Sequence, residues 1–290
     1  MKINYAPILL VLFLMFCWNS SLFSQDVDLD LVDMVKPPAS VTNPAQARSE
    51  AISNLDDAIM PLLDLFGFYT GGGLYHSAGT HGLGGFDVGV RVVTMIVSND
   101  QKPDLPFPQS PTFKPAQGGI FRDVTLMPLP LLQVSLGLPG DLEAIGRFFT
   151  YPIGEGQDEG NITLIGLGVK YGLLQNILLP RVAVVASYHY LNVPSSFDFG
   201  SANNISAALV VSKSFAIIDF YGGVGYDYTT LKVKLQLPNP IGDVNKEYNK
   251  SNFRGNVGFK ISPFPLLFIH ADYNFGGVKG FNAGLGLSFR

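Results

Sequence analysis

The sequence has little cysteine and little charge. The single cysteine, Cys17, lies in an apolar N-terminal run that we expect to be removed, so the exported chain has no disulfide framework and no cysteine for a metal centre. Charged residues make up 14% of the chain, against about 25% in ordinary soluble domains. The formal net charge of −4 argues against nucleic acid as a partner.

Long hydrophobic runs are also missing after the N-terminus. No later segment reaches the roughly 18 uninterrupted apolar residues of a membrane helix, although 47% of the residues are hydrophobic. High apolarity without a helical span is typical of a transmembrane β-barrel, whose apolar outer face alternates with lumen residues. The alternative interpretation is a secreted, soluble β-sandwich.

The N-terminus reads as a secretory signal peptide. Lys2 supplies the charged region, and residues 8–17 form the short apolar region that follows it. Ser24, just before Gln25, is the expected cleavage point. We therefore predict a signal peptide over residues 1–24 and export through it to the outer membrane of a Gram-negative cell envelope.

A helical segment is predicted next. Asn43 can cap a helix, and Pro44 is tolerated at its first position. The spacing of apolar residues predicts a helix over 44–66, which Pro61 should kink or end. A glycine-rich strip with His76 and His81 follows, and residues 25–82 are predicted to form a plug in the lumen of the barrel.

From residue 83 onward the hydrophobic period becomes two, as a strand requires. The last stretch shows it best, because Phe281, Leu285 and Phe289 alternate with small or polar residues. We predict an all-β, antiparallel, up-and-down transmembrane barrel over residues 83–290. Its ten expected strands are 83–97, 125–138, 141–150, 160–174, 181–193, 200–212, 215–236, 251–261, 264–275 and 280–289.

The connections sort by length. Short turns at 139–140, 213–214 and 262–263 fall at one end, and the longer loops fall at the other, with 276–279 as the exception. Outer-membrane barrels sort their loops in this way. Twelve strands is the alternative, if 68–77 or 119–125 also pairs. The apolar phase flips after Thr229, which predicts a bulge, and the far half of that strand should project beyond the membrane.

The same alternation predicts which polar side chains face the lumen. Their charges are of both signs, which favours mutual pairing over ion selectivity, and lumen-facing glycines leave room for the plug. We also expect Arg254 to lie opposite Asp272 on the neighbouring strand. The lumen-facing candidates are Asp87, Arg91, Glu143, Arg147, Lys170, His189, Asp219, Arg254, His270 and Asp272, with His76 and His81 as plug candidates.

Enzyme chemistry is not expected. His76 and His81 have no third histidine or cysteine near them in the sequence, so we predict no metal site, and we predict no cofactor. His270 and Asp272, with Ser288 on the next strand, resemble hydrolase residues only in composition. Hydrolysis at the lipid face would need serine and histidine to point outward, and these point inward.

Two stretches carry a resemblance. Residues 64–78, continued by His81 and 84–87, and residues 130–138, continued by Glu143 and Arg147, resemble an uncharacterised family of Bacteroidetes outer-membrane proteins. More distantly, the chain is similar to the long-chain fatty-acid transporter barrels, whose plug carries an Asn-Pro-Ala signature that residues 43–45 match in letters.

The resemblance implies a porin-like transport function. We expect passage of a small hydrophobic or amphipathic solute, controlled by the plug, and the alternative is a non-transporting structural or surface-interaction barrel. The expected partners are outer-membrane lipid, a small hydrophobic ligand, and the barrel-assembly machinery acting through the C-terminal strand.

Overall fold

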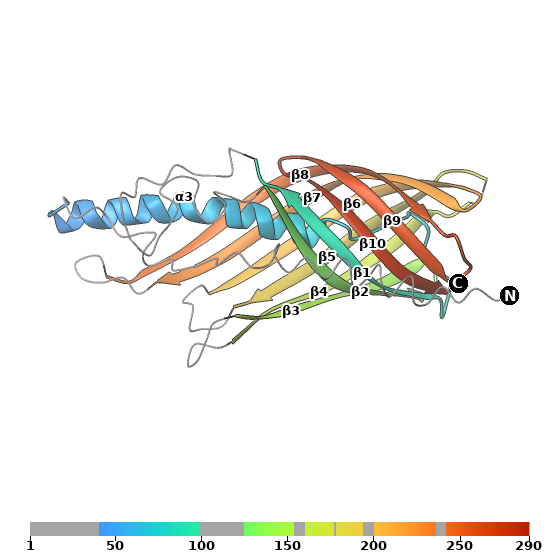
Figure 1. Ribbon diagram of the computed structural model, residues 1–290, viewed down its shortest axis with the longest axis horizontal. Helices are drawn as coiled ribbons and strands as arrows, with labels where there is room; N and C mark the ends of the chain where they lie inside the picture. The colour runs from blue at the N-terminus through green and yellow to red at the C-terminus, as the bar shows by residue number, and fades with distance from the viewer. Residues whose placement is uncertain are drawn as a thin grey trace. The chain divides into compact units, whose positions relative to one another are not determined.

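Ten strands close into an antiparallel barrel in the computed structural model (Figure 1), which describes residues 41–98, 125–153, 160–176, 178–193, 200–235 and 242–289. Strands adjacent in the chain are adjacent in the sheet, and β1 pairs with β10 to close it. The strands are β1 (Phe86–Ile96), β2 (Leu126–Leu138), β3 (Leu142–Ile153), β4 (Gly160–Leu174), β5 (Arg181–Asn192), β6 (Ser201–Phe215), β7 (Ile218–Leu235), β8 (Val244–Ile261), β9 (Leu267–Gly276) and β10 (Lys279–Phe289).

The ten-strand prediction is confirmed, and the twelve-strand alternative is wrong. Residues 68–77 belong to the end of a helix and the irregular segment after it. The predicted signal peptide and residues 119–124 lie outside the described residues. Alternation explains the strands: in β10, Phe281 and Phe289 are exposed, whereas Asn282 between them is buried.

Two strand ends differ from the sequence prediction. The hairpin expected at 213–214 turns at Ala216 and Ile217, and Ala216 adopts a φ of 52°. β8 begins at Val244, inside a polar segment predicted as a loop. Polar residues are stable there because β8 pairs with β7 along its whole length, through to Leu235 opposite Val244.

The predicted bulge after Thr229 is wrong. β7 pairs with β6 and β8 in continuous register through this position. The apolar residues move from the outer to the inner face of β7 after Thr229 because the inner face there packs against the helix. Tyr226 and Tyr228 are exposed on the outer face, whereas Leu231 and Val233 are buried on the inner face and belong to the cluster formed with the helix.

One helix, α3 (Pro44–Gly71), precedes the barrel and confirms the predicted helix start. Asn43 accepts hydrogen bonds from the amides of Ala45 and Gln46, and Pro44 occupies the first turn. The helix does not end at Pro61 but runs through it to Gly71. Ile59 and Leu63, on either side of Pro61, are buried, and their packing offsets the lost backbone hydrogen bond. Among the described residues, no helix has the length and apolarity needed to cross a membrane.

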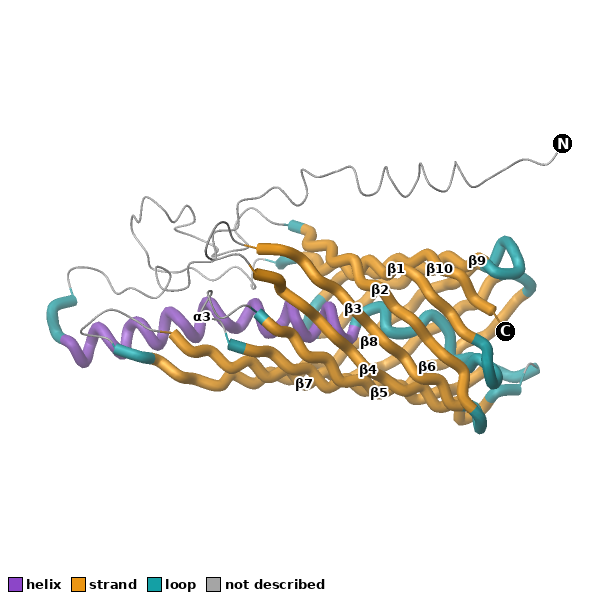
Figure 2. Tube along the Cα trace, turned by 90° about the horizontal axis from the view of Figure 1, so that it is seen from below, coloured by secondary structure: helices purple, strands orange, loops and turns teal. Residues whose placement is uncertain are grey.

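The helix enters the barrel at its C-terminal end. Figure 2 shows α3 running beside β7 and β8, with its N-terminal part beyond the ends of most other strands. Polar contacts follow β8 in steps: Arg48 to the Asp243 carbonyl (3.2 Å), Asp56 to Lys246, and Asp64 to Lys250 (2.8 Å). The steps match because eight helical residues rise about 12 Å, and the three or four strand residues of each step rise about 10–13 Å.

The two ends of the barrel differ in their connections. The segments 139–141, 175–180, 216–217 and 262–266 join strands at one end, here called the short-turn end, where β1 begins and β10 finishes. The segments 97–125, 154–159, 193–200 and 236–243 join strands at the other, here called the long-loop end. The contact of Arg48 with Asp243 places the N-terminal part of α3 at the long-loop end.

Candidate functional site

The lumen is the candidate site, and the structure brings all twelve predicted polar residues into it. Each is buried, with no more than 9% of its surface exposed. The filled space has two parts. The helix half contains α3 and apolar strand residues, and the polar half contains the segment 72–85, here called the plug loop, among charged strand residues.

Arg147 holds the C-terminal end of the helix. Its Nη1 donates to the carbonyl oxygens of Tyr69 (3.4 Å), Thr70 (3.0 Å) and Gly72 (2.9 Å). The last carbonyls of a helix lack partners within it, and that end carries partial negative charge. α3 has no basic residue in its last turn, so Arg147 of β3 supplies the missing cation from the barrel wall.

Gln133 fixes the position of this arginine. Its Oε1 accepts from Arg147 Nε at 2.8 Å, and its Nε2 donates to the Leu74 carbonyl at 3.1 Å. One side chain of β2 therefore orients the guanidinium and binds the plug loop as well. Arg147 therefore binds the end of α3, and Gln133 binds the plug loop that follows it.

His81 sits between a carboxylate and a hydroxyl. Its Nδ1 lies 2.8 Å from Glu143 Oε2, and its Nε2 lies 3.1 Å from Ser288 Oγ. The His81 amide donates to the same Glu143 oxygen at 3.1 Å, and Lys170 Nζ pairs with Glu143 Oε1 at 2.8 Å. With the carboxylate accepting the Nδ1 proton, Nε2 is left as an acceptor for the serine hydroxyl.

Asp87 and Arg91 form a second group beside the plug loop. Arg91 Nη2 lies 3.5 Å from Asp87 Oδ1 and 3.1 Å from His76 Nδ1. His76 stacks on Phe268, with ring centroids 4.6 Å apart, and Arg91 lies over the same ring. Burial, reinforced by the charge of Arg91, holds the pKa of His76 well below its ordinary value.

Asp272 collects neutral donors, and the predicted Arg254–Asp272 pair is wrong. Tyr221, Asn274 and Asn282 donate to Asp272 at 2.7–2.8 Å. Both Arg254 and Asp272 face the lumen, but the connection 262–266 is longer than the two-residue turn expected, so Arg254 lies opposite Gly276. Arg254 instead pairs with Asp227 at 3.2 Å.

The remaining predicted residues complete the inventory of the lumen. Asp219 pairs with Lys260 (2.9 Å) and Arg181 (3.3 Å) near the short-turn end. His189 is buried, and neither of its ring nitrogens has a hydrogen-bond partner among the described residues. It occupies the space that a side chain at Gly166 would need.

The lumen glycines have two roles rather than the single one predicted. A side chain at Gly223 would overlap the hydroxyl of Tyr75, so this glycine makes room for the plug loop. Gly284 makes room for His270, which belongs to the barrel itself. Polar side chains of the wall therefore fold across the lumen and fill part of the space that the sequence assigned to the plug.

A metal ion is poorly suited to this cluster. Donor atoms of His81, Asp87 and Glu143 lie within 4.8 Å of one another. Arg91 and Lys170 already balance the two carboxylates, so a divalent cation would add uncompensated charge to a buried site. The absence of a metal stays a prediction.

A cavity of about 630 Å³ opens at the short-turn end. Its wall includes apolar side chains from three connections, namely Leu179, Ile217 and Leu266. The charged group of Asp219, Arg181 and Lys260 also lines it. Ser288, whose hydroxyl is bonded to His81, also lines this cavity and is partly exposed.

Several lumen residues were missed by the sequence analysis. Asp227 lies between the outward Tyr226 and Tyr228, so the alternation could have identified it. Tyr75 and Gln133 had no such signal, because their importance comes from contacts between segments far apart in the chain.

Comparison with known proteins gives a family and a set of distant folds. The sequence model of a family of unknown function (DUF6588) matches residues 105–289. No curated protein matches the chain.

Three solved structures illustrate the likeness. The translocator domain of the autotransporter NalP from Neisseria meningitidis is 10% identical, with a TM-score of 0.37 over 81% of this chain and 98% of that domain. Ail, the attachment invasion locus protein of Yersinia pestis, is 13% identical, with a TM-score of 0.29 over 71% and 98%. OmpT, an outer membrane protein of Vibrio cholerae, is 13% identical, with a TM-score of 0.29 over 59% and 58%.

Proposed function

The chain belongs to the DUF6588 family of unknown function, and from this starting point we propose that it is an outer-membrane barrel that passes a small hydrophobic or amphipathic solute under control of its plug. The observation that carries the proposal is the set of hydrogen bonds from Arg147 to the carbonyl oxygens at the end of α3. Hydrogen bonds from one wall side chain to the end of a helix can be released without unfolding the barrel.

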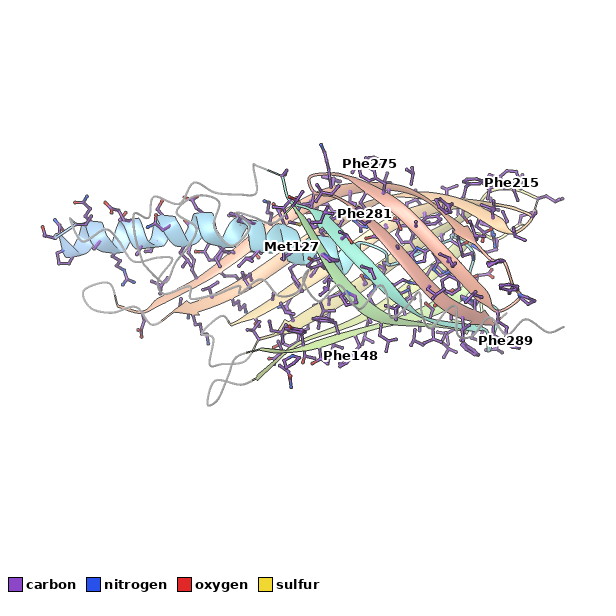
Figure 3. All side chains as sticks on the ribbon, viewed as in Figure 1. Met127, Phe148, Phe215, Phe275, Phe281 and Phe289 are labelled. Atoms are coloured by element: carbon purple, nitrogen blue, oxygen red, sulfur yellow. The ribbon has the colours of Figure 1, made fainter. Side chains whose placement is uncertain are left out.

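The outer surface supports the membrane location. Every strand carries exposed apolar side chains on its outer face. Figure 3 shows Phe215 and Phe289 at the short-turn end, and Phe148, Phe275 and Phe281 further toward the long loops. Aromatic girdles at both edges of an apolar belt are typical of outer-membrane barrels. Beyond the belt, the exposed outer pair Lys232–Glu247 suits water.

A charge on the outer face tests the membrane location. Leu287 is 52% exposed, and Leu287→Arg should cost about 2–4 kcal/mol if this site lies at the bilayer midplane and less near an interface. Gly286→Arg, one residue away, points into the lumen against Phe268 and serves as the matched control. Equal free energies of folding into bilayers for wild type and Leu287→Arg would contradict a lipid-facing β10.

The shape of the lumen supports control by the plug. α3 and the plug loop together fill both halves of the lumen, so a solute passes only if they move. The helix half is lined by apolar side chains, including Val93, Leu131 and Leu231. This lining suits the hydrophobic part of an amphipathic solute and is in keeping with the resemblance to fatty-acid transporter barrels.

A reversible disulfide tests the control directly. A Cβ placed at Gly67 of α3 would lie 4.0 Å from the Cβ of Thr229 in β7, and the contact closer than 3 Å is with the Thr229 hydroxyl, which cysteine replaces. Disulfides need a Cβ separation of about 3.5–4.5 Å. Gly67→Cys with Thr229→Cys should therefore lock the helix to the wall when oxidised and release it when reduced.

Solute flux into proteoliposomes is the measurement, with each single cysteine variant as a control. We expect the oxidised double variant to block uptake of a medium-chain fatty acid, and reduction to restore wild-type uptake. Removal of residues 26–82 should increase liposome swelling. No uptake in any redox state, with the barrel folded, would contradict transport and favour a non-transporting barrel.

The second candidate is a surface-interaction barrel, and the position of the helix favours it. The N-terminal turns of α3 lie at the long-loop end, where Gln46 and Ser49 are exposed. Long loops face the outside of the cell in outer-membrane barrels. A cysteine at Ser49 should then react with a membrane-impermeant maleimide on intact cells, whereas one at Ser262, in a short turn, should not.

A further inference from the structure

The group Ser288, His81 and Glu143 has the geometry of a nucleophile, its base and the group that orients the base. A serine nucleophile needs an imidazole nitrogen within about 2.6–3.2 Å, and that imidazole must be oriented by a third group. Here the serine-to-histidine distance is 3.1 Å and the histidine-to-carboxylate distance is 2.8 Å. The three residues come from β10, the plug loop and β3.

The other histidines show that this arrangement is not general in the lumen. His76 Nδ1 faces the guanidinium of Arg91, and His189 has no ring partner among the described residues. His270 contacts Tyr221 at 3.3 Å. Of the four histidines, which are all described, His81 is the one placed between a carboxylate and a serine hydroxyl.

Access distinguishes Ser288 from a purely structural serine. His81 and Glu143 are 3% and 1% exposed, whereas Ser288 is partly exposed and lines the 630 Å³ cavity. A serine nucleophile must be accessible to the substrate, whereas the histidine that serves as its base can be buried. A hydrolase was not expected from the sequence, because Ser288 was grouped with His270 and Asp272 and these residues face inward. A substrate that enters the cavity at the short-turn end would reach Ser288 from inside the barrel, so hydrolysis does not require a serine on the lipid face.

We propose that Ser288, His81 and Glu143 form an esterase site in the cavity at the short-turn end, which acts on carboxylic esters with an apolar acyl chain. The substrate class follows from the lining. Leu179, Ile217 and Leu266 supply an apolar wall for the acyl chain. The charged part of the lining, Arg181 and Lys260 around Asp219, carries one net positive charge. This proposal goes beyond the transport function and does not depend on it.

The chemistry is a two-step transfer with water as the second substrate. Ser288 Oγ attacks the ester carbonyl carbon while its proton passes to His81 Nε2. His81 returns that proton to the alcohol oxygen as the carbon–oxygen bond breaks, leaving an acyl-serine. Water then attacks the acyl carbon, again through His81, and releases the carboxylic acid while restoring Ser288. Glu143 is a positioning residue, since its carboxylate bonds to His81 and Lys170 and acts on Ser288 through the imidazole.

The test uses the full mature chain refolded in detergent and a fluorophosphonate probe, with peptide mass spectrometry to locate the label. We expect the label on Ser288 and hydrolysis of p-nitrophenyl butyrate. Ser288→Ala, which removes one oxygen atom, should abolish both. His81→Asn should slow labelling at least about 100-fold, as expected for loss of a general base. Ser49→Ala, on the exposed N-terminal part of α3 at the long-loop end, should change neither.

The role of Glu143 must be tested by a measurement that would not change if the residue only supported the fold. Glu143→Gln removes the acceptor for the His81 proton and should lower hydrolysis at least about 100-fold, while Glu143→Asp should recover part of it. Heat-modified gel migration shows which variants contain a folded barrel. An unlabelled Ser288 in folded wild type, or equal labelling of wild type and folded His81→Asn, would overturn the proposal.

Discussion

The two halves of the lumen hold the N-terminal segment by different means. In the helix half, apolar residues of α3 such as Leu55 and Ile59 pack against strand residues that include Val93 and Val233. In the polar half, Leu74, Tyr75 and Ala78 of the plug loop pack in a smaller apolar cluster. Directional contacts from Arg147, Gln133 and Glu143 are added to that packing. The same wall of β-strands therefore provides a packing surface at one depth and a hydrogen-bonding surface at another.

The two kinds of contact contribute differently to the stability of the docked plug and to its position. Burying one large aliphatic side chain contributes about 1.5–3 kcal/mol and tolerates small shifts. A buried charge pair gains little over its desolvation cost but is strongly unfavourable when one partner is lost. The helix half should therefore supply most of the free energy that keeps the plug docked, and the polar half should determine where the plug loop lies.

The largest expected effect is in the helix half. Leu63 is fully buried, and Leu63→Ala should destabilise the docked helix by about 2–5 kcal/mol because it leaves a cavity. The measurement is hydrogen exchange of α3 amides in the folded barrel. Met60, on the exposed side of the helix at 40% exposure, is the control, and equal effects of Met60→Ala and Leu63→Ala would contradict packing as the main source of stability.

Loss of the arginine at the helix end should come next. Arg147→Met keeps the aliphatic stem but removes hydrogen bonds to three carbonyls, and a charged hydrogen bond contributes about 1.5–3 kcal/mol. We expect faster exchange in the last turn of α3 and higher single-channel conductance. Lys232→Met, which removes an exposed charge from the outer face of β7, should leave both unchanged; conductance identical to wild type in Arg147→Met would show that this contact does not hold the plug.

A smaller effect is expected on the ladder between α3 and β8. Asp56→Asn removes one charge of the partly exposed pair with Lys246, and such pairs contribute about 0–1 kcal/mol. The change should be salt-dependent and should appear in exchange rates of the middle of α3. A loss larger than that of Leu63→Ala would reverse the ranking of the two kinds of contact.

The smallest effect concerns pH. His76 is kept neutral by burial among Arg91, Lys260, His270 and Lys170, with Asp87 Oδ2 3.7 Å from its Nε2. In a released plug loop its pKa returns to about 6.5, so the released state binds the proton more readily. Docking should therefore weaken as pH falls below about 6.5. Conductance should rise from pH 7.5 to 5, and His76→Gln should reduce this rise; an equal rise in His76→Gln would assign it to other groups.

The strands and their inward and outward faces could be predicted because they depend on neighbouring residues alone. Alternation placed Asp87, Glu143 and Arg254 in the lumen without reference to any other strand. The same local pattern misread Thr229 as a bulge, since it assumed that apolar residues always face lipid. It also missed the early start of β8, where polar residues are paired by β7.

The partners of the lumen residues could not be predicted. The pair Ile261–Ile269 between β8 and β9 encloses seven residues where the expected turn had two, and this shift places Arg254 opposite Gly276. Arg254 pairs with Asp227 of β7 instead of Asp272. The meeting of Ser288 with His81 requires residues 207 positions apart to converge, and no local pattern contains that information.

By itself, the sequence determined the ten strands, the capped helix and the polar lumen, because hydrophobic period and capping act within a few residues. Only the tertiary structure decided that α3 enters from the long-loop end, that Arg147 caps it from the wall, and that Ser288, His81 and Glu143 meet. Those outcomes depend on barrel closure, which sets the register between strands and brings distant segments within hydrogen-bonding distance.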